Sequence, residues 1–168
     1  MNNSALYKLS YGVYVIGSVK QGKYNGQIAN TVVQITSEPP TLAVSINRNN
    51  LTHDYITTSG IFSVSILSQS APLSFIGGFG FKSGRDVDKT KNANYKIGDT
   101  GAPVFLDHAT AYLEAEVLQK LDVGTHTLFI GKLVAAEVLS NDPVMTYEYY
   151  HQVKRGTTPK SAPSYIAQ

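Results

Sequence analysis

The sequence predicts a single domain dominated by β-strands, with a few short helices. Short runs of β-branched and aromatic residues, separated by turn-forming residues, recur along its 168 residues. No repeat of 20–50 residues and no regular alternation of strands with long helices is found, which favours a β-barrel or sandwich over a parallel α/β fold. A chain of this length buries roughly 70% of the surface that its unfolded form exposes, which is enough for one substantial core.

Four β-type runs are expected in the first half of the chain. Gly22, in the turn after the first run, supplies the positive φ that a tight hairpin requires. A short helix over 50–56, capped by the side chain of Asn50 or Thr52, is expected between the third and fourth runs. The four runs occupy residues 12–19, 28–35, 41–46 and 62–66.

An irregular, glycine-rich segment is expected over 70–105, with one short helix near 72–76. The run 77–84 is interpreted as a surface loop. It has the glycines of a phosphate-binding P-loop, but Phe81 stands where that motif needs a glycine directly before Lys-Ser. The common phosphate motifs are therefore excluded here.

Two long strands are predicted after this segment, joined by a turn at 122–124. In the first of them, Leu113, Ala115 and Val117 alternate with Glu114 and Glu116. This alternation predicts one buried face and one solvent face. The second strand covers 127–138.

The C-terminal residues have a different composition from the rest. We expect a barrel over 1–142 and a C-terminal arm of the same domain over 143–168, first rich in tyrosine and then basic. Outside this arm the charges nearly balance, which argues against a nucleic-acid partner. The N-terminus does not resemble a secretory signal, and no run of eighteen apolar residues is found. We therefore expect a cytoplasmic protein without a membrane span.

Neither thiol nor metal chemistry is indicated. The sequence has no cysteine, which excludes Cys-ligated zinc, iron–sulfur clusters and thiol nucleophiles. The four histidines lie far apart without the spacing of a metal site, so no metal is expected. The Gly-x-Ser-x-Gly elbow of hydrolases is also missing.

Small polar residues gather near the second and third β-type runs. Asn30 and Thr31 interrupt an apolar run, and residues 45–52 place five hydrogen-bonding side chains and one arginine at a strand-to-helix junction. Hydroxyls, an arginine and the N–H groups of a helix N-terminus suit a phosphate monoester. The cluster 85–89 adds positive charge. Helix capping and a solvated turn are the alternative interpretation, and the spacing does not decide between the two.

The order and spacing of these residues resemble the flavin reductase-like family, the FMN-binding split β-barrels. The resemblance covers nearly the whole chain and is strongest for flavin domains of anaerobic electron-transfer proteins, some fused to rubredoxin, and for ferric reductases. Because this chain has no cysteine, any downstream acceptor is expected to be a separate molecule. The matching features are Gly26-x-x-Ala29-Asn30-Thr31, Ser37-x-Pro39-Pro40, Ser45-x-Asn47-x-x-x-x-Thr52, Ser59-Gly60-x-Phe62-x-Val64, the run Ser83-Gly84-Arg85-Asp86-Val87-Asp88-Lys89 and Gly124-x-His126-Thr127-x-x-x-Gly131.

The resemblance implies a homodimeric Greek-key barrel that binds FMN near the subunit interface. His126 matches a histidine near the nicotinamide side of the flavin; the alternative is a hydrogen-bonded, inert histidine. Tyr147, Tyr149, Tyr150 and Tyr165 either belong to a solvated tail or shield the flavin or the partner subunit. By position, the resemblance implies that Ala29, Asn30 and Thr31 meet the flavin ring, that Ser45, Ile46, Asn47, Arg48, Asn50 and Thr52 surround the ribityl chain and phosphate, and that Ser83, Gly84, Arg85 and Lys89 complete the phosphate site.

The implied activity is that of an NAD(P)H:flavin oxidoreductase. It would transfer a hydride from NAD(P)H to bound FMN, and electrons onward to free flavin, a ferric complex, rubredoxin or another redox protein. Two alternatives stay open at this point. One is a non-enzymatic FMN electron carrier reduced by a protein donor, and the other is a small-ligand barrel without redox chemistry.

Overall fold

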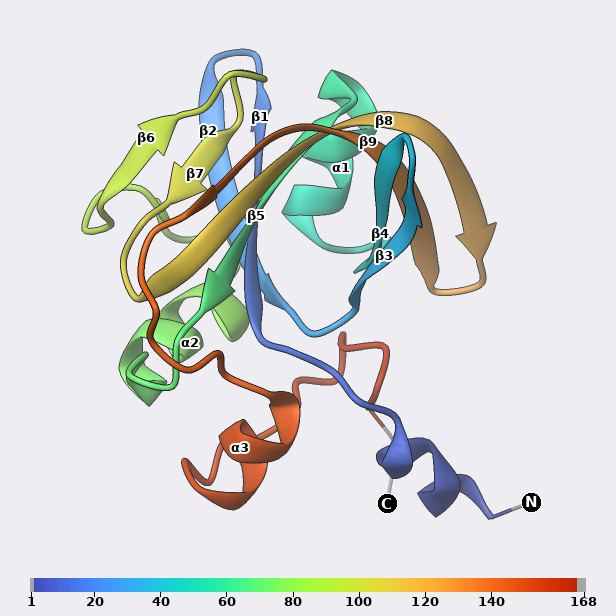
Figure 1. Cartoon of the computed structure of the whole chain (residues 1–168), viewed down its shortest axis with the longest axis vertical. Helices are drawn as coiled ribbons and strands as arrows, with labels where there is room; N and C mark the ends of the chain where they lie inside the picture. Colours follow the sequence, from blue (N-terminus) through green and yellow to red (C-terminus); the bar gives the residue numbers. More distant parts are fainter. Residues whose placement is uncertain (1, 166–168) are drawn as a thin grey trace.

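The computed structural model describes residues 2–165, and its main element is one curled antiparallel sheet of seven strands (Figure 1). The β-dominated barrel class predicted from the sequence is confirmed. The strands of the sheet are β1 (Tyr14–Lys20), β2 (Lys23–Ala29), β3 (Val32–Ser37), β4 (Pro40–Asn47), β5 (Ile61–Leu67), β8 (Ala109–Val123) and β9 (His126–Val138), in the order β2-β1-β5-β8-β9-β4-β3.

Short helices and a small second sheet cover this barrel. α1 (Leu51–Ser59) packs against β1 and β2, and it ends at Gly60, whose φ of 72° is left-handed. α3 and both ends of the described chain lie below the barrel in Figure 1. The remaining elements are the 3-10 helix η1 (Asn3–Lys8), α2 (Leu73–Gly80), α3 (Tyr147–Gln152) and the strand pair β6 (Tyr95–Ile97) and β7 (Pro103–Phe105).

Two hydrophobic clusters lie on opposite faces of β1. Ile16 belongs to the first, with Phe62 and Phe129, inside the curl of the sheet. Its neighbour Val15 belongs to the second, with Phe105, under α2, β7 and α3. Because successive strand residues point to opposite faces, a strand that is covered on both sides shows no polar alternation.

The turn after β1 forms as predicted, but the run 28–35 is not one strand. Gln21 and Gly22 both have positive φ, 50° and 74°, as a two-residue hairpin requires. β2 ends at Ala29 and pairs with β1, whereas β3 begins at Val32 and pairs with β4. These two strands are at opposite edges of the sheet. Asn30 and Thr31 connect them, so the polar pair marks a crossing between sheet edges.

The predicted solvent face of β8 is wrong at Glu114. This side chain is only 1% exposed. Its carboxylate accepts hydrogen bonds from the Asp99 N–H (3.1 Å), the Thr100 N–H (2.9 Å) and the Thr100 hydroxyl (2.7 Å). The connection between β6 and β7 covers this face and supplies all three donors. Glu116, on the same face, is exposed as expected.

The segment 77–84 and the C-terminal arm also differ from the predictions. The helix expected near 72–76 forms, but α2 continues through Gly80 and buries Phe79, so the surface-loop interpretation is wrong for 77–80. The C-terminal region, expected to be more an arm than a core element, places Met145 and Tyr150 in the second cluster. The domain division at residue 142 stays a prediction. No helix in the described part of the chain is long and apolar enough to cross a membrane.

Candidate functional site

A cavity of about 290 Å³ lies where β2, the end of β4, the first turn of α1, the end of α2 and the C-terminal segment meet. Its walls are mixed, with apolar groups such as Phe79 and Tyr150 beside amides, hydroxyls and cations. The cavity lies at the lower end of the range of roughly 300–1,000 Å³ that is usual for small-molecule sites.

Most of the residues proposed from the sequence line this cavity, although they come from three distant segments. The part that each of these residues plays in binding FMN stays a prediction. The predicted residues in the lining are Ala29, Asn30, Ser45, Asn47, Asn50, Thr52, Ser83, Gly84, Arg85 and Lys89.

Three predicted residues lie outside the lining. Ile46 is fully buried in the first hydrophobic cluster, on the opposite face of β4 from Ser45 and Asn47. Arg48 is exposed, and its N–H donates to the Thr125 carbonyl at 2.9 Å. Thr31 does not line the cavity, but it contacts a residue that does, because its hydroxyl donates to the Asn30 side chain at 3.0 Å.

Lys89 places a buried cation at one end of the cavity. It is 7% exposed, and its Nζ donates to the Phe79 carbonyl at 3.1 Å. Burial, assisted by the charge of Lys82, lowers the pKa of Lys89 from 10.5 to about 8. Within residues 2–165, neither of the two ion pairs involves Lys89. The Nζ also lies over the Phe79 ring, 5.4 Å from its centroid. A buried ammonium whose partners are one carbonyl and one ring face is a ready site for an anion.

The surroundings of Lys89 add further features of an anion site. Arg85 also lines the cavity, is exposed and donates to the Asn49 carbonyl at 3.0 Å. A Cβ on Gly84 would collide with the side chains of Asn25 and Leu51, so this position requires glycine. The backbone at Gly84 therefore lies closer to Asn25 and Leu51 than any residue with a side chain could.

The alternative interpretation of Asn50 and Thr52 as capping side chains is wrong. Asn50 stands at the N-cap of α1, but its side chain makes no cap bond and donates instead to Gln27 Oε1 at 3.1 Å. Thr52 is buried, and its hydroxyl accepts from Asn25 Nδ2 at 2.8 Å. The His53 N–H donates to the Asn50 carbonyl at 3.1 Å. The first turn of α1 thus borders the cavity without a side-chain cap, which leaves the N–H groups of Leu51 and Thr52 for another acceptor.

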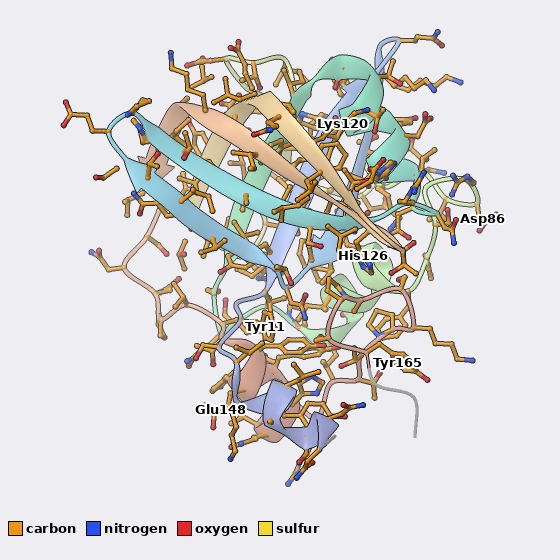
Figure 2. The ribbon with its side chains drawn as sticks, turned by 90° about the vertical axis from the view of Figure 1, so that its right-hand side faces the viewer. Tyr11, Asp86, Lys120, His126, Glu148 and Tyr165 are labelled. Carbon is orange, nitrogen blue, oxygen red and sulfur yellow. The ribbon has the colours of Figure 1, made fainter. Side chains whose placement is uncertain are left out.

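His126 lies beside the first cavity rather than in it. It lines a second cavity of about 420 Å³, which shares Ser45 and Asn47 with the first. Figure 2 shows His126 next to the loop that leads to Tyr165. Its Nε2 lies 3.1 Å from the Ser161 carbonyl, and its Nδ1 lies 2.8 Å from the Thr125 hydroxyl. Because a carbonyl only accepts, Nε2 carries a proton and donates it to Ser161.

Several lining residues were not singled out from the sequence. Asn25 and Gln27 stand in an ordinary strand, and residues 157–163 contribute five positions to the lining. The tyrosines of this region gave a partial signal, since Tyr147 and Tyr150 line the first cavity and Tyr165 lines the second. Among the described residues, no group of three His, Asp or Glu side chains could hold a metal ion.

Comparisons with known proteins point in one direction. The family model described as flavin reductase like domain matches residues 6–158. The chain is 54% identical to a high molecular weight rubredoxin of Moorella thermoacetica, over 98% of this chain and 72% of that protein. It is 47% identical to a ferric-chelate reductase (NAD(P)H) of Archaeoglobus fulgidus, over 99% of this chain and 98% of that protein. The structure matches an FMN-binding protein from Thermus thermophilus with a TM-score of 0.72 at 28% identity, over 79% of this chain and 74% of that one.

Proposed function

Because the chain belongs to the flavin reductase like family, we propose that it is an NAD(P)H:flavin oxidoreductase with FMN as its cofactor. The similarity to a ferric-chelate reductase named for NAD(P)H and to an FMN-binding protein supports both parts of this proposal. The observation that carries it is the buried, under-partnered ammonium of Lys89 at the end of a cavity with apolar walls.

The residues present fit FMN at its phosphate end. A phosphate monoester needs cations and N–H donors. Lys89 and Arg85 supply the cations, and the uncapped first turn of α1 supplies N–H groups. Ser83 adds a hydroxyl, and Gly84 permits the close approach of the loop. We assign these residues to the phosphate.

The residues also fit the rest of the cofactor. An isoalloxazine ring needs apolar walls and, at its polar edge, both donors and acceptors. Tyr150 is available as a wall, and Ala29 and Asn30 border the cavity at the end of β2. We assign Ala29 and Asn30 to the ring, with Thr31 as the residue that orients the Asn30 amide. The groups left for the ribityl chain are Ser45, Asn47, Asn50 and Thr52, with Ile46 and Arg48 supporting the β4 end from outside.

When bound, FMN supplies the capacity to accept a hydride and to release electrons one or two at a time. The chain's own part is binding and orientation. Lys89 and Arg85 neutralise the phosphate charge, and Asn30 fixes the polar edge of the ring. His126 offers its Nε2–H to the pyridine nucleotide. Hydride transfer needs closeness and alignment rather than a general acid, so we assign His126 to nucleotide binding.

The partners follow from the same proposal. A pyridine nucleotide is the electron donor. The similarity to a rubredoxin-type protein and to a ferric-chelate reductase supports a separate redox protein, such as rubredoxin, or a ferric complex as acceptor, with free flavin as a further candidate.

We also propose a homodimer. The edge strand β3 exposes Val33 and Ile35, and β8 exposes Leu118 and Leu121. Large exposed apolar side chains beside an open sheet edge are typical of a subunit interface. Light scattering at several concentrations tests this: a mass of twice 18.2 kDa supports the dimer, and a monomer overturns it.

The proposed activity is tested by an anaerobic absorbance spectrum of the purified protein with added FMN, before and after NADH or NADPH. Protein-bound flavin absorbance that bleaches with the nucleotide supports the oxidoreductase. Absorbance that bleaches with dithionite only would indicate a non-enzymatic electron carrier. If FMN does not bind at all, the assignment of the cavity is wrong. Lys89→Met, which removes the buried cation, should lose FMN, and Lys91→Met at an exposed position of the same loop is the matched control.

A further inference from the structure

We propose that the C-terminal segment 156–165, here called the strap, is a gate that the pyridine nucleotide displaces in order to reach the flavin. This inference rests on the proposed function, because it concerns access to the same site. The strap borders both cavities, and its side chains and carbonyls bond to the residues assigned to the flavin and to the nucleotide.

The strap stands between the two cavities. Ala162 and Pro163 line both of them, and Ser161 lines the first. Hydride transfer requires the reacting atoms to approach to roughly 3–3.5 Å. A nicotinamide held at His126 in the second cavity is separated by the strap from a flavin in the first. The structure therefore shows a closed form, in which the donor cannot reach the acceptor.

The bonds that close the strap use groups that a ligand needs. Asn30 Nδ2 donates to the Ser164 hydroxyl at 2.6 Å. The Ser161 carbonyl accepts from His126 Nε2 at 3.1 Å and from Asn47 Nδ2 at 3.3 Å. His126 has a single Nε2–H, so this proton cannot serve the strap and a nucleotide at the same time. Strap closure and nucleotide binding therefore compete.

The strap has a firm root and a weakly held tip. At the root, the Tyr150 hydroxyl donates to the Thr157 carbonyl at 2.9 Å, and Gly156 packs against the Tyr150 ring. Beyond residue 158, the backbone bonds recorded for the described residues are internal to the strap, from Ala162 to Pro159 and from Tyr165 to Ala162. Segments held by a few side-chain bonds open at low cost. The tip from about residue 159 onward is thus the moving part.

Opening of the gate has opposite effects on the two ligands. A nucleotide that binds only the open form has its affinity reduced by the fraction of protein that is open. FMN, in contrast, lies behind the strap and is released only when it opens. A variant with a weaker latch should therefore bind the nucleotide more tightly and release FMN more rapidly.

Ser164→Ala tests the gate without touching the lining of either cavity. It removes the hydroxyl that accepts from Asn30 at 2.6 Å and donates to the Tyr147 hydroxyl at 3.4 Å. The loss of the shorter of these two bonds alone shifts an equilibrium by about five-fold. We expect the dissociation constant of NAD⁺ or NADP⁺, a donor product that transfers no hydride, to fall by about that factor. The rate of FMN release should rise by a similar factor. Ser164→Thr keeps the hydroxyl and should behave as the parent, as should Ser140→Ala, where the hydroxyl bonds only to nearby Asp142.

A second measurement follows the strap itself. The chain has no tryptophan, so Tyr165→Trp places a unique fluorophore on the strap. In the FMN-loaded protein the flavin should quench this residue, and addition of the oxidised nucleotide should raise its emission. If FMN binds and NAD(P)H reduces it, but the emission stays constant and Ser164→Ala changes neither constant, the gate is wrong and the proposed function stands. If FMN does not bind to the parent protein, both the proposed function and the gate are wrong. The absorbance spectrum, rather than the tryptophan emission, reveals that outcome.

Discussion

Lys89 is the residue at which stability and proposed cofactor binding oppose each other. The lowering of its pKa from 10.5 to about 8 costs roughly 3 kcal/mol of folding free energy at neutral pH, because each pH unit is worth about 1.4 kcal/mol. Lys89→Met removes this cost and keeps an apolar chain of similar length. It loses the bond to the Phe79 carbonyl and the contact of Nζ with the Phe79 ring, each worth about 1 kcal/mol. The cofactor-free variant should therefore be more stable than the parent by about 1 kcal/mol.

Urea unfolding of the cofactor-free proteins measures this difference. The sign of its pH dependence is fixed by linkage. The unfolded lysine keeps its proton up to about 10.5, whereas the folded one releases it near 8, so the parent gains stability as the pH rises between these values. The advantage of the variant should shrink over the same range. FMN affinity should fall by at least about ten-fold in Lys89→Met, because a charge-assisted bond to phosphate is lost.

A Lys89→Met protein that is less stable than the parent at neutral pH would refute the reasoning, and so would one that binds FMN equally well. Lys91→Met serves as the control, since Lys91 is exposed and should change neither quantity.

Three further predictions follow from the described contacts. FMN affinity in the parent should weaken as the pH rises above about 8, because Lys89 loses its proton; Lys89→Arg should keep its affinity there, as a calorimetric titration can establish. His126→Ala should raise the KM for NAD(P)H more than it lowers kcat in steady-state assays, and an unchanged KM with a collapsed kcat would contradict the assigned role. Glu114→Ala leaves three donors of the β6–β7 connection without their acceptor, so it should destabilise the fold by about 2–4 kcal/mol in urea unfolding, whereas Glu116→Ala should not.

The sequence predicted those features that depend on neighbouring residues. The hairpin at Gly22 formed because its backbone requirement is local, and the strands formed where β-branched residues cluster. Glu114 was misread because the donors that bury it come from the β6–β7 connection, more than ten residues away. The helical residues 77–80 were misread for a similar reason. Their glycines disfavour a helix by local propensity, but the burial of Phe79 in the second cluster overrides that preference.

In the candidate site, too, local features could be predicted and contacts between distant segments could not. The resemblance to the flavin reductase-like family indicated which segments would contribute, and ten of the residues that it implied do line the cavity. The pattern did not indicate which side of a segment would face it. Ile46 and Ser45 are neighbours, yet strand alternation places one in the core and the other at the cavity. Tyr165 was proposed from the sequence as a candidate shield of the flavin, but the place of the strap over the site could not be predicted, because it depends on contacts with Asn30, Asn47 and His126, all distant in sequence.

These contacts also determine where a ligand gains affinity. Most amides of the site already have partners in the described protein: Asn25 bonds Thr52, Asn50 bonds Gln27, and Asn30 and Asn47 bond the strap. A ligand that bonds to Asn47 exchanges one hydrogen bond for another, so its net gain there is small. Asn30 Nδ2 has a second N–H for the ring and keeps its bond to Ser164 while FMN lies behind the strap. Lys89 differs, because a bound anion offsets the free-energy cost of burying its charge with few partners. The affinity for FMN should therefore be concentrated at the phosphate, while the strap governs the exchange of ligands at the ring.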